Sequence, residues 1–276
     1  MNRVDNIIIG FGKAGKTLAG YLGSKGEKTV LVEKSPLMYG GTCINVGCIP
    51  SKFLATSADR KAYSQLGDEE YYKQAVENKK ALISKLNKAN YDKVAGVPNV
   101  EVIDGLASFK DEHTVSIKTE SGVQELYAER IFINTGTTPF VPEIEGLEIK
   151  GRIHTSETIM NLEEFPRSLA ISGSGFIGLE FAASYAKFGT KVTIIDRGSK
   201  VLPREDEDVA NAVFEAYKGL GIEFIFDANI EKVEQNESEV KISYSSKGEA
   251  HELSAEAFLV ATGRKANVEG LNLEAA

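Results

Sequence analysis

The run Asn6-Ile7-Ile8-Ile9-Gly10-Phe11-Gly12-Lys13-Ala14-Gly15 decides how the first part of this chain folds. Its apolar residues predict a buried β-strand, and the helical pattern that follows, from Lys16 to Lys25, is closed by Gly26. A second apolar run, Thr29 to Val32, ends in Glu33. A glycine-rich turn framed by strand, helix, strand and a terminal acid predicts a dinucleotide-binding site.

Each glycine of this turn has its own physical reason. Gly10 permits the tight turn, Gly12 lets the backbone approach a pyrophosphate, and Gly15 allows the helix to pack closely on the strand. Phosphate would then lie at the N-terminus of the helix, and Glu33 would accept hydrogen bonds from ribose hydroxyls. Glycines that only make a turn are the alternative for a single copy of such a motif.

The same plan occurs a second time. The strand Leu169-Ala170-Ile171-Ser172 leads into Gly173-Ser174-Gly175-Phe176-Ile177-Gly178, and a helix through Phe188 stops at Gly189. The next apolar run, Val192 to Ile195, ends in Asp196. The acid follows the first glycine by the same distance in both copies, since 33 − 10 = 23 and 196 − 173 = 23. Two framed copies make the turn-only alternative much weaker.

The repeat continues beyond the two turns. Alternating runs broken by Asp, Gly and Ser lie between Val100 and Tyr127 and between Ile222 and Leu253, and they predict a small antiparallel meander in each half. Each meander leads into an apolar strand that ends in Thr-Gly, at Thr135-Gly136 and at Thr262-Gly263. We therefore predict an α/β fold with two Rossmann-like, three-layer dinucleotide-binding domains, each with a β-meander.

Two segments lie outside the duplicated plan. The stretch Thr138-Pro139-Phe140-Val141-Pro142 is predicted to link the two halves, because proline interrupts both helices and interior strands. Between Lys52 and Val94, tyrosines and aliphatic residues recur at roughly helical spacing. This pattern predicts a helix packed against the first sheet, with an aromatic stacking surface as the alternative.

Both cysteines of the chain lie in one glycine-rich run, from Gly40 to Lys52. Four residues separate Cys43 from Cys48, which suits a redox pair that opens and closes during turnover. A static disulfide is one alternative, but so short a loop would restrict the unfolded chain little. Half of a zinc site is the other, but the three histidines stand far off without ligand spacing. Paired cysteines in such a loop favour catalytic use in a reducing compartment.

Composition excludes several classes of partner. The chain has 276 residues, of which 42% are hydrophobic, and its net charge is -8. No clustered basic face is evident, so we expect neither nucleic acid nor an anionic membrane as a partner. The N-terminus enters an apolar strand almost directly, without a signal-peptide pattern, and no apolar stretch is long enough to span a bilayer. We expect a cytoplasmic protein.

The run from Gly40 to Lys52 resembles the redox-active segment of the class I pyridine nucleotide-disulfide oxidoreductases, the FAD enzymes that include lipoamide dehydrogenase, glutathione reductase and mercuric reductase. The resemblance implies the first part of an FAD-binding domain at 1–143, an NAD(P)-binding domain at 144–266 and the start of a return to the FAD domain at 267–276. The runs Ile9 to Leu18 and Met38 to Gly41 look closest to bacterial members linked to resistance to reactive chlorine, which are thought to reduce metal ions such as copper(II).

The resemblance also implies roles for single residues. Cys48 would lie against the flavin, and Cys43 would face the substrate and exchange with it; a helix N-terminus, which lowers a thiol pKa, makes such reactivity reasonable. Lys52 and Glu180 would pair beside the flavin, with the lysine stabilising negative charge on the reduced ring. Phe176 stands where many relatives carry a tyrosine that gates the nicotinamide.

The cofactor sites implied in this way are FAD in the first half and NAD(P)H in the second. The predicted cofactor-binding residues are Gly10, Gly12, Gly15, Glu33, Gly41, Thr42, Gly47, Lys52, Ala107, Thr135, Gly136, Gly173, Gly175, Phe176, Ile177, Gly178, Glu180, Asp196, Gly263 and Arg264. No metal site is predicted. An acid at Asp196 would accept ribose hydroxyls and repel a 2′-phosphate, which favours NADH, although Arg197 beside it could meet that phosphate.

The expected function is a flavoprotein oxidoreductase that passes electrons from NAD(P)H through FAD to the Cys43-Cys48 pair and on to a small disulfide or a metal ion. Family members continue well past the position that matches Ala276, into an interface domain whose His-Glu pair serves the partner subunit of a homodimer. We therefore expect this chain to lack the interface domain. The alternatives are a nucleotide-binding fragment without complete turnover, and an NADH oxidase or diaphorase that does not use the dithiol.

Overall fold

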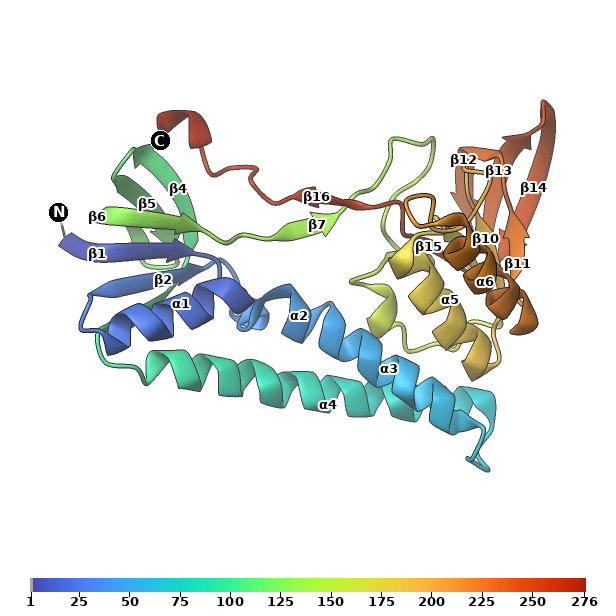
Figure 1. Ribbon diagram of the computed structural model, residues 1–276, viewed down its shortest axis with the longest axis horizontal. Coiled ribbons are helices and arrows are strands. Elements are labelled where there is room, and N and C mark those ends of the chain that lie inside the picture. Colours follow the sequence, from blue (N-terminus) through green and yellow to red (C-terminus); the bar gives the residue numbers. More distant parts are fainter. Residues whose placement is uncertain (1) are drawn as a thin grey trace. The chain divides into compact units, whose positions relative to one another are not determined.

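The computed structural model describes residues 2–276, and its chain divides into two compact units. Among these residues, the first unit comprises 2–50, 81–138 and 266–276, and the second comprises 51–80 and 139–265. Each unit combines a parallel sheet, helices and an antiparallel meander, as Figure 1 shows. The predicted duplicated α/β architecture is therefore confirmed.

The first unit is built on a six-stranded sheet. Its strands follow the order β3 (Val100–Asp104), β2 (Thr29–Glu33), β1 (Asn2–Ile9), β6 (Gly122–Ile133), β5 (Thr114–Thr119) and β4 (Leu106–Asp111). The strands β3, β2, β1 and β6 are parallel, whereas β6, β5 and β4 form the antiparallel meander. The predicted meander region thus begins with a parallel strand, because residues 100–104 pair with β2 instead.

Both faces of the parallel sheet are buried. Ile7 and Ile9 face a cluster with Phe109 and Ile117 of the meander. Ile8 points to the other side, where it packs with Ala19 of helix α1 (Lys13–Ser24). A strand that is covered on both sides reads as a continuous apolar run, which is why β1 shows no polar alternation at residues 7–9.

The second unit repeats the plan with a five-stranded parallel sheet. Its strands follow the order β11 (Glu223–Ile225), β10 (Lys191–Ile195), β9 (Ser168–Ser172), β15 (Ala257–Val260) and β8 (Ile153–Thr155). Helix α5 (Phe176–Phe188) packs against β9 and β10, and helix α6 (Glu207–Gly219) follows β10 in the chain. The meander is a separate sheet of β12 (Ala228–Gln235), β13 (Val240–Ser246) and β14 (Glu249–Ala255), packed on β8 and β15 through Ile153, Phe258 and Ile242.

The segment between the cysteines and β3 forms helices α3 (Cys48–Lys61) and α4 (Asp68–Ala95). Only the end of α4 packs on the first sheet as predicted, where Val94 joins the cluster of Ile8. Residues 51–80 belong to the second unit, and the range of 1–143 for an FAD-binding domain stays a prediction. Long-range contacts explain this placement of residues 51–80: the buried Tyr72 donates its hydroxyl hydrogen to the carbonyl of Leu162, 2.9 Å away, and its hydroxyl lies 3.0 Å from that of Tyr185.

Short elements complete the chain. The predicted proline-rich linker contains strand β7 (Thr137–Pro139), which pairs with β16 (Arg264–Ala266). The last residues return to the first unit, where Leu271 is buried and its carbonyl accepts from Phe109 N–H at 2.8 Å. The remaining short helices are η1 (Pro36–Met38), α2 (Gly41–Asn45), η2 (Ile159–Asn161) and η3 (Leu273–Ala275). Within residues 2–276, the helices are all too short or too polar to cross a membrane.

Candidate nucleotide and dithiol sites

The first glycine turn has the geometry that a dinucleotide requires. Gly10 has φ of +107°, and a Cβ atom there would lie 2.8 Å from the carbonyl carbon of Asn134. A Cβ atom on Gly15 would collide with the carbonyl oxygen of Gly10. Gly12 precedes α1 and provides no side-chain cap, so the unpaired N–H groups of the first turn are available to an anion.

Both acids hold their turns by the same pair of hydrogen bonds. The Glu33 carboxylate accepts from the N–H of Phe11, at 2.9 Å, and from the N–H of Ser35, at 3.2 Å. The Asp196 carboxylate accepts from Ser174 N–H, at 2.6 Å, and from the N–H two residues beyond itself, at 2.7 Å. The duplication therefore extends to individual hydrogen bonds. Burial raises the pKa of Glu33, and the hydrogen bonds from the backbone oppose that rise.

The second glycine turn separates packing from access. Gly173 has φ of +108°, and a Cβ atom on Gly178 would collide with the carbonyl oxygen of Gly173. A Cβ atom on Gly175 would meet no heavy atom within 4 Å. Gly175 also precedes α5 without capping its first N–H groups by a side chain. The backbone here can approach a ligand closely, which fits a pyrophosphate.

Other predicted FAD-site residues gather around the first turn. A Cβ atom on Gly41 would lie 2.5 Å from the Cα of Gly12, so the dithiol loop touches the first turn. A Cβ atom on Gly136 would lie 4.0 Å from the hydroxyl oxygen of Thr42. Thr135 directly precedes Gly136, and its carbonyl accepts from the Asn267 side chain at 3.4 Å.

Ala107 presents its backbone rather than its side chain. The side chain is buried in the core between the meander and the parallel sheet. Phe109, two residues further on β4, uses its outward N–H and C=O for Leu271 and Asn272. Because backbone direction alternates along a strand, the N–H and C=O of Ala107 point to the same edge. A ligand there would be bound by main-chain groups only.

The two cysteines belong to the first unit, Cys43 in α2 and Cys48 as the first residue of α3. Cys43 is half-buried and Cys48 is exposed. A hydrogen bond with Cys48 and burial raise the pKa of Cys43, against the lowering influence of Lys16. The lowered pKa that a helix N-terminus would give is therefore not found at Cys43 in the dithiol state. A Cβ atom on Gly47 would lie 2.9 Å from the carbonyl oxygen of Thr42, so this turn needs glycine.

Polar contacts that the sequence patterns did not indicate fix the dithiol loop. The Asn45 side chain donates to the carbonyls of Tyr39, at 3.0 Å, and Gly41, at 2.9 Å. The Tyr39 hydroxyl donates to the Asp104 carboxylate, with oxygens 2.7 and 2.8 Å away, and burial followed by this bond raises the tyrosine pKa. Asn134 was also missed: its amide donates to the carbonyl of Gly10 at 3.0 Å. A lone polar residue at the end of an apolar strand was the available signal.

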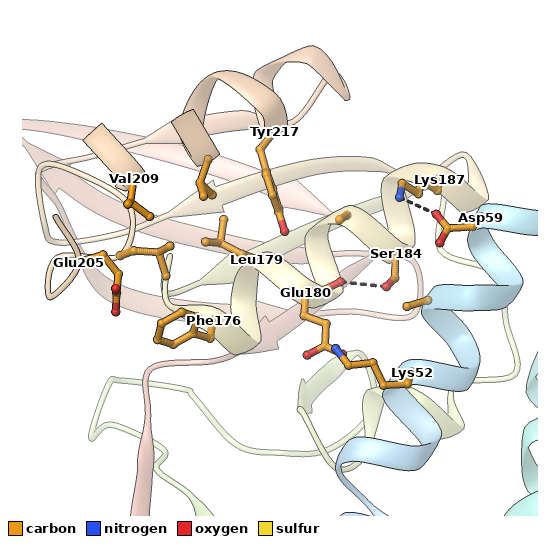
Figure 2. A pocket seen from close by; sticks show the side chains of 14 residues that line it. Lys52, Asp59, Phe176, Leu179, Glu180, Ser184, Lys187, Glu205, Val209 and Tyr217 are labelled. Carbon is orange, nitrogen blue, oxygen red and sulfur yellow. Dashed lines mark hydrogen bonds and ion pairs between the residues drawn. The ribbon is translucent and has the colours of Figure 1, made fainter. Parts of the chain in front are cut away.

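The second unit contains a pocket of about 470 Å³ between α3, α5 and α6. Figure 2 shows Lys52 on α3 and Glu180 on α5 pointing toward one another at its lower edge. Leu179 and Val209 supply apolar wall, and Phe176 stands at the first position of α5 with 68% of its surface exposed. The pocket thus joins an apolar wall to a charged pair.

The Lys52–Glu180 ion pair orients its two side chains but contributes little to the free energy of folding. Lys52 Nζ lies 2.8 Å from Glu180 Oε1, and the Ser51 hydroxyl donates to the same oxygen at 2.9 Å. Because 71% of the lysine side chain is exposed, the pair contributes only about 0.2–1 kcal/mol to folding. Cys48 and Lys52 are four residues apart on α3 and so share one face of that helix.

The predicted residues at the second Thr-Gly pair are also defined. Gly263 has φ of +139°, a backbone angle that residues with a side chain rarely adopt. Arg264 donates to the Glu157 carboxylate at 3.0 Å, a partner that sequence spacing does not reveal. Among residues 2–276, no group of three or more His, Cys, Asp and Glu side chains is placed to hold a metal ion.

Known proteins are similar to this chain over nearly all of its length. The family model for pyridine nucleotide-disulphide oxidoreductases matches residues 4–276. The chain is 38% identical over 274 residues to the probable pyridine nucleotide-disulfide oxidoreductase RclA of Escherichia coli, covering 99% of this chain and 59% of that protein. It is 32% identical over 282 residues to a mercuric reductase of Staphylococcus aureus, covering 99% of this chain and 50% of that protein.

A solved structure is similar over the whole chain. The Cu(II) complex of the HOCl-induced flavoprotein disulfide reductase RclA from Escherichia coli superposes with a TM-score of 0.91 at 38% identity. The match covers 100% of this chain and 60% of that one. The chain therefore spans about half to three-fifths of the length of these relatives.

Proposed function

Because the chain belongs to the pyridine nucleotide-disulphide oxidoreductase family, we propose that it passes electrons from NAD(P)H through FAD to the Cys43-Cys48 pair and on to a disulfide or a metal ion. One observation carries the proposal. The two thiols share a hydrogen bond on a loop whose Gly41 touches Gly12 of the first nucleotide turn. A dithiol so close to a dinucleotide cradle supports redox use rather than a static disulfide.

The two turns take different nucleotides in this proposal. Gly10, Gly12 and Glu33 hold FAD, together with the main chain of Ala107, and the second turn holds NAD(P)H. FAD supplies the chemistry that turns a two-electron hydride donor into a reductant of sulfur. The domain boundaries near residues 143 and 266 belong to the same proposal.

The thiols carry the exchange with a disulfide substrate. Cys43 loses its proton to solvent, and its sulfur attacks one sulfur of the substrate, so that a mixed disulfide forms and a substrate thiolate leaves. The deprotonated sulfur of Cys48 then attacks Cys43. This second step forms the Cys43–Cys48 disulfide and releases the other substrate thiolate, so two electrons leave the pair. NAD(P)H held at the second turn would supply the two electrons that restore the dithiol.

Lys52 and Glu180 fix a positive charge for this cycle. The Glu180 carboxylate, which also accepts from the Ser51 hydroxyl, restrains the lysine. Its ammonium would then stabilise the negative charge that develops on the flavin during reduction. The ring of Phe176 is exposed and would cover the nicotinamide as a flap without a hydroxyl.

The acceptor is a small disulfide or a metal ion such as copper(II). Thiolates are soft ligands that suit copper(I), the reduced ion, and the Escherichia coli relative has been solved as a Cu(II) complex. Asp196 favours NADH over NADPH, because a carboxylate repels a 2′-phosphate. The proposal includes a homodimer. It also includes a cytoplasmic location, because a dithiol that cycles needs a reducing compartment.

Anaerobic titration with NADH tests the proposal. We expect the purified protein to carry FAD, to lose its yellow absorbance on reduction, and to show two additional free thiols in a thiol assay after the oxidised protein is reduced. Cys43→Ser should abolish the reduction of a disulfide dye. The oxidation of NADH by oxygen should continue in this variant. Colourless protein would contradict the proposal in favour of a nucleotide-binding fragment, and unchanged disulfide reduction by the variant would favour a diaphorase.

A further inference from the structure

Helices α1 and α2 begin against one another. The contact is between Gly12, which precedes α1, and Gly41, the first residue of α2, with 2.5 Å between a Cβ atom placed on Gly41 and the Cα of Gly12. The N–H of Lys16 donates to the carbonyl of Gly12 at 3.0 Å, which puts Lys16 one helical turn beyond the contact. Cys43 lies two residues beyond it on α2. The side chains of Lys16 and Cys43 therefore belong to the first turns of two helices whose N-termini are in contact.

The ammonium group of Lys16 is held in place. It donates to Oδ1 of Asn90 on α4, and the amide nitrogen of Asn90 donates to the carbonyl of Leu86 at 2.7 Å. That second bond orients the amide so that its oxygen faces the lysine. Asn90 also packs against the start of the dithiol loop, because its Cγ lies 3.3 Å from a Cβ atom placed on Gly40. The half-buried lysine is thus fixed beside this loop.

The surroundings of Lys16 are unfavourable for a lysine. Its hydrogen-bond partner is a neutral amide, which leaves the positive charge uncancelled. Burial lowers the pKa of Lys16, and Lys13 and Lys93 lower it further, whereas Cys43 raises it. Reciprocally, Lys16 lowers the pKa of Cys43, against the hydrogen bond from Cys48 and burial. Of these neighbours, only the thiolate of Cys43 favours the charged form of Lys16. A role in the reactivity of Cys43 explains this placement more readily than a contribution to folding stability.

We propose that Lys16 is a positioning residue of the dithiol site, where its ammonium group, held by Asn90, stabilises the thiolate of Cys43. The inference rests on the proposed role of Cys43 as the exchanging thiol. Lys16 keeps its proton throughout: Cys43 releases its own proton to water, and the resulting sulfur anion faces a fixed positive charge. The lysine thereby offsets the rise in thiol pKa that the neighbouring Cys48 and burial cause.

Alkylation of a single thiol tests this role without any electron transfer. In FAD-loaded protein carrying Cys48→Ala, the rate of iodoacetamide addition to Cys43 is measured against pH by mass spectrometry. Lys16→Met and Lys16→Gln both remove the charge, and Gln can keep the contact with Asn90. Below the midpoint of the profile, we expect each to slow alkylation about three- to tenfold, through an upward shift in the thiol pKa of about half a unit to one unit.

The controls separate charge from shape. Lys16→Arg should keep the profile of the parent, and Lys25→Met, at the other end of α1, should also leave it in place. Unchanged midpoints in both Lys16→Met and Lys16→Gln, with folding verified by circular dichroism, would overturn the inference. Such a result would leave the proposed function intact if NADH still reduced the dithiol, whereas a shifted midpoint without NADH reduction would fault the function alone.

Discussion

Several charged side chains of this protein are held by uncharged partners. Glu33 and Asp196 accept backbone N–H groups, Lys16 donates to an amide, and the buried Lys79 donates to the carbonyl of Met160 and the amide oxygen of Asn161. Burial without an opposite charge nearby lowers the pKa of Lys16 and of Lys79, because it disfavours the charged form. Exposed ion pairs elsewhere on the surface contribute little by comparison.

Lys79 should make stability depend on pH. Burial lowers its pKa to about 8 in the folded state, from 10.5 in the reference state. Between these values the unfolded chain binds more protons, so the free energy of unfolding rises with pH. Relative to Lys79→Met, the parent should gain about 3 kcal/mol between about pH 7 and pH 11, measured by urea unfolding.

A neighbouring lysine provides the control for this measurement. Lys80 is exposed and pairs with Glu163 on the surface, so Lys80→Met removes one charge from the same helix without opening the core. Its stability should follow that of the parent across the pH range. An unfolding free energy of Lys79→Met that ran parallel to the parent would show that the buried ammonium is not the cause.

At the scale of elements, the strand-turn-helix unit explains why two glycines in one motif serve different ends. Gly178 lies in the first turn of α5, directly over the carbonyl of Gly173, so its missing side chain lets the helix approach the strand. Gly175 precedes the helix with φ of -79°, a conformation open to other residues, and nothing crowds it. Its missing side chain leaves room for a ligand instead.

Alanine substitutions should separate these two roles. Gly178→Ala should lower the free energy of unfolding by about 3 kcal/mol, because its Cβ atom would meet backbone that cannot move aside. Gly175→Ala should cost only about 1 kcal/mol, because alanine is a poorer N-cap residue than glycine, yet it should weaken NADH binding at least tenfold. Thermal unfolding and NADH fluorescence titration measure the two effects. Tight NADH binding by Gly175→Ala would show that the nucleotide does not approach this backbone.

Sequence patterns predict the parts of such units that follow from local physics. The glycine turns, the strands that flank them and the acids that end them were all predicted, because each depends on spacing along one short segment. The partner of a helix is not local: the spacing of Tyr72 and Val94 shows an apolar face, but not that the two residues pack in different units. Polar contacts between residues far apart in the sequence, such as Lys16 and Asn90, follow no spacing rule. They can be seen only in the folded structure.

At the scale of the whole molecule, one binding plan is used twice with matching hydrogen bonds. Each unit has its own sheet, its own glycine turn and its own acid, and the acid of each unit bonds only to backbone and side chains of that unit in the contacts described for residues 2–276. A substitution in one unit should therefore weaken nucleotide binding in that unit alone, even though electron transfer needs both nucleotides.

Paired substitutions of the acids test this independence. Glu33→Gln and Asp196→Asn each replace one accepting oxygen by an NH₂ group, which would face a backbone N–H and loosen the turn at a cost of about 1–3 kcal/mol. Glu33→Gln should lower the FAD content per protein, seen as visible absorbance, while NADH affinity at the second turn persists. Asp196→Asn should do the reverse. Equal loss of both nucleotides in either variant, at preserved folding, would mean that the two turns do not act as separate binding modules.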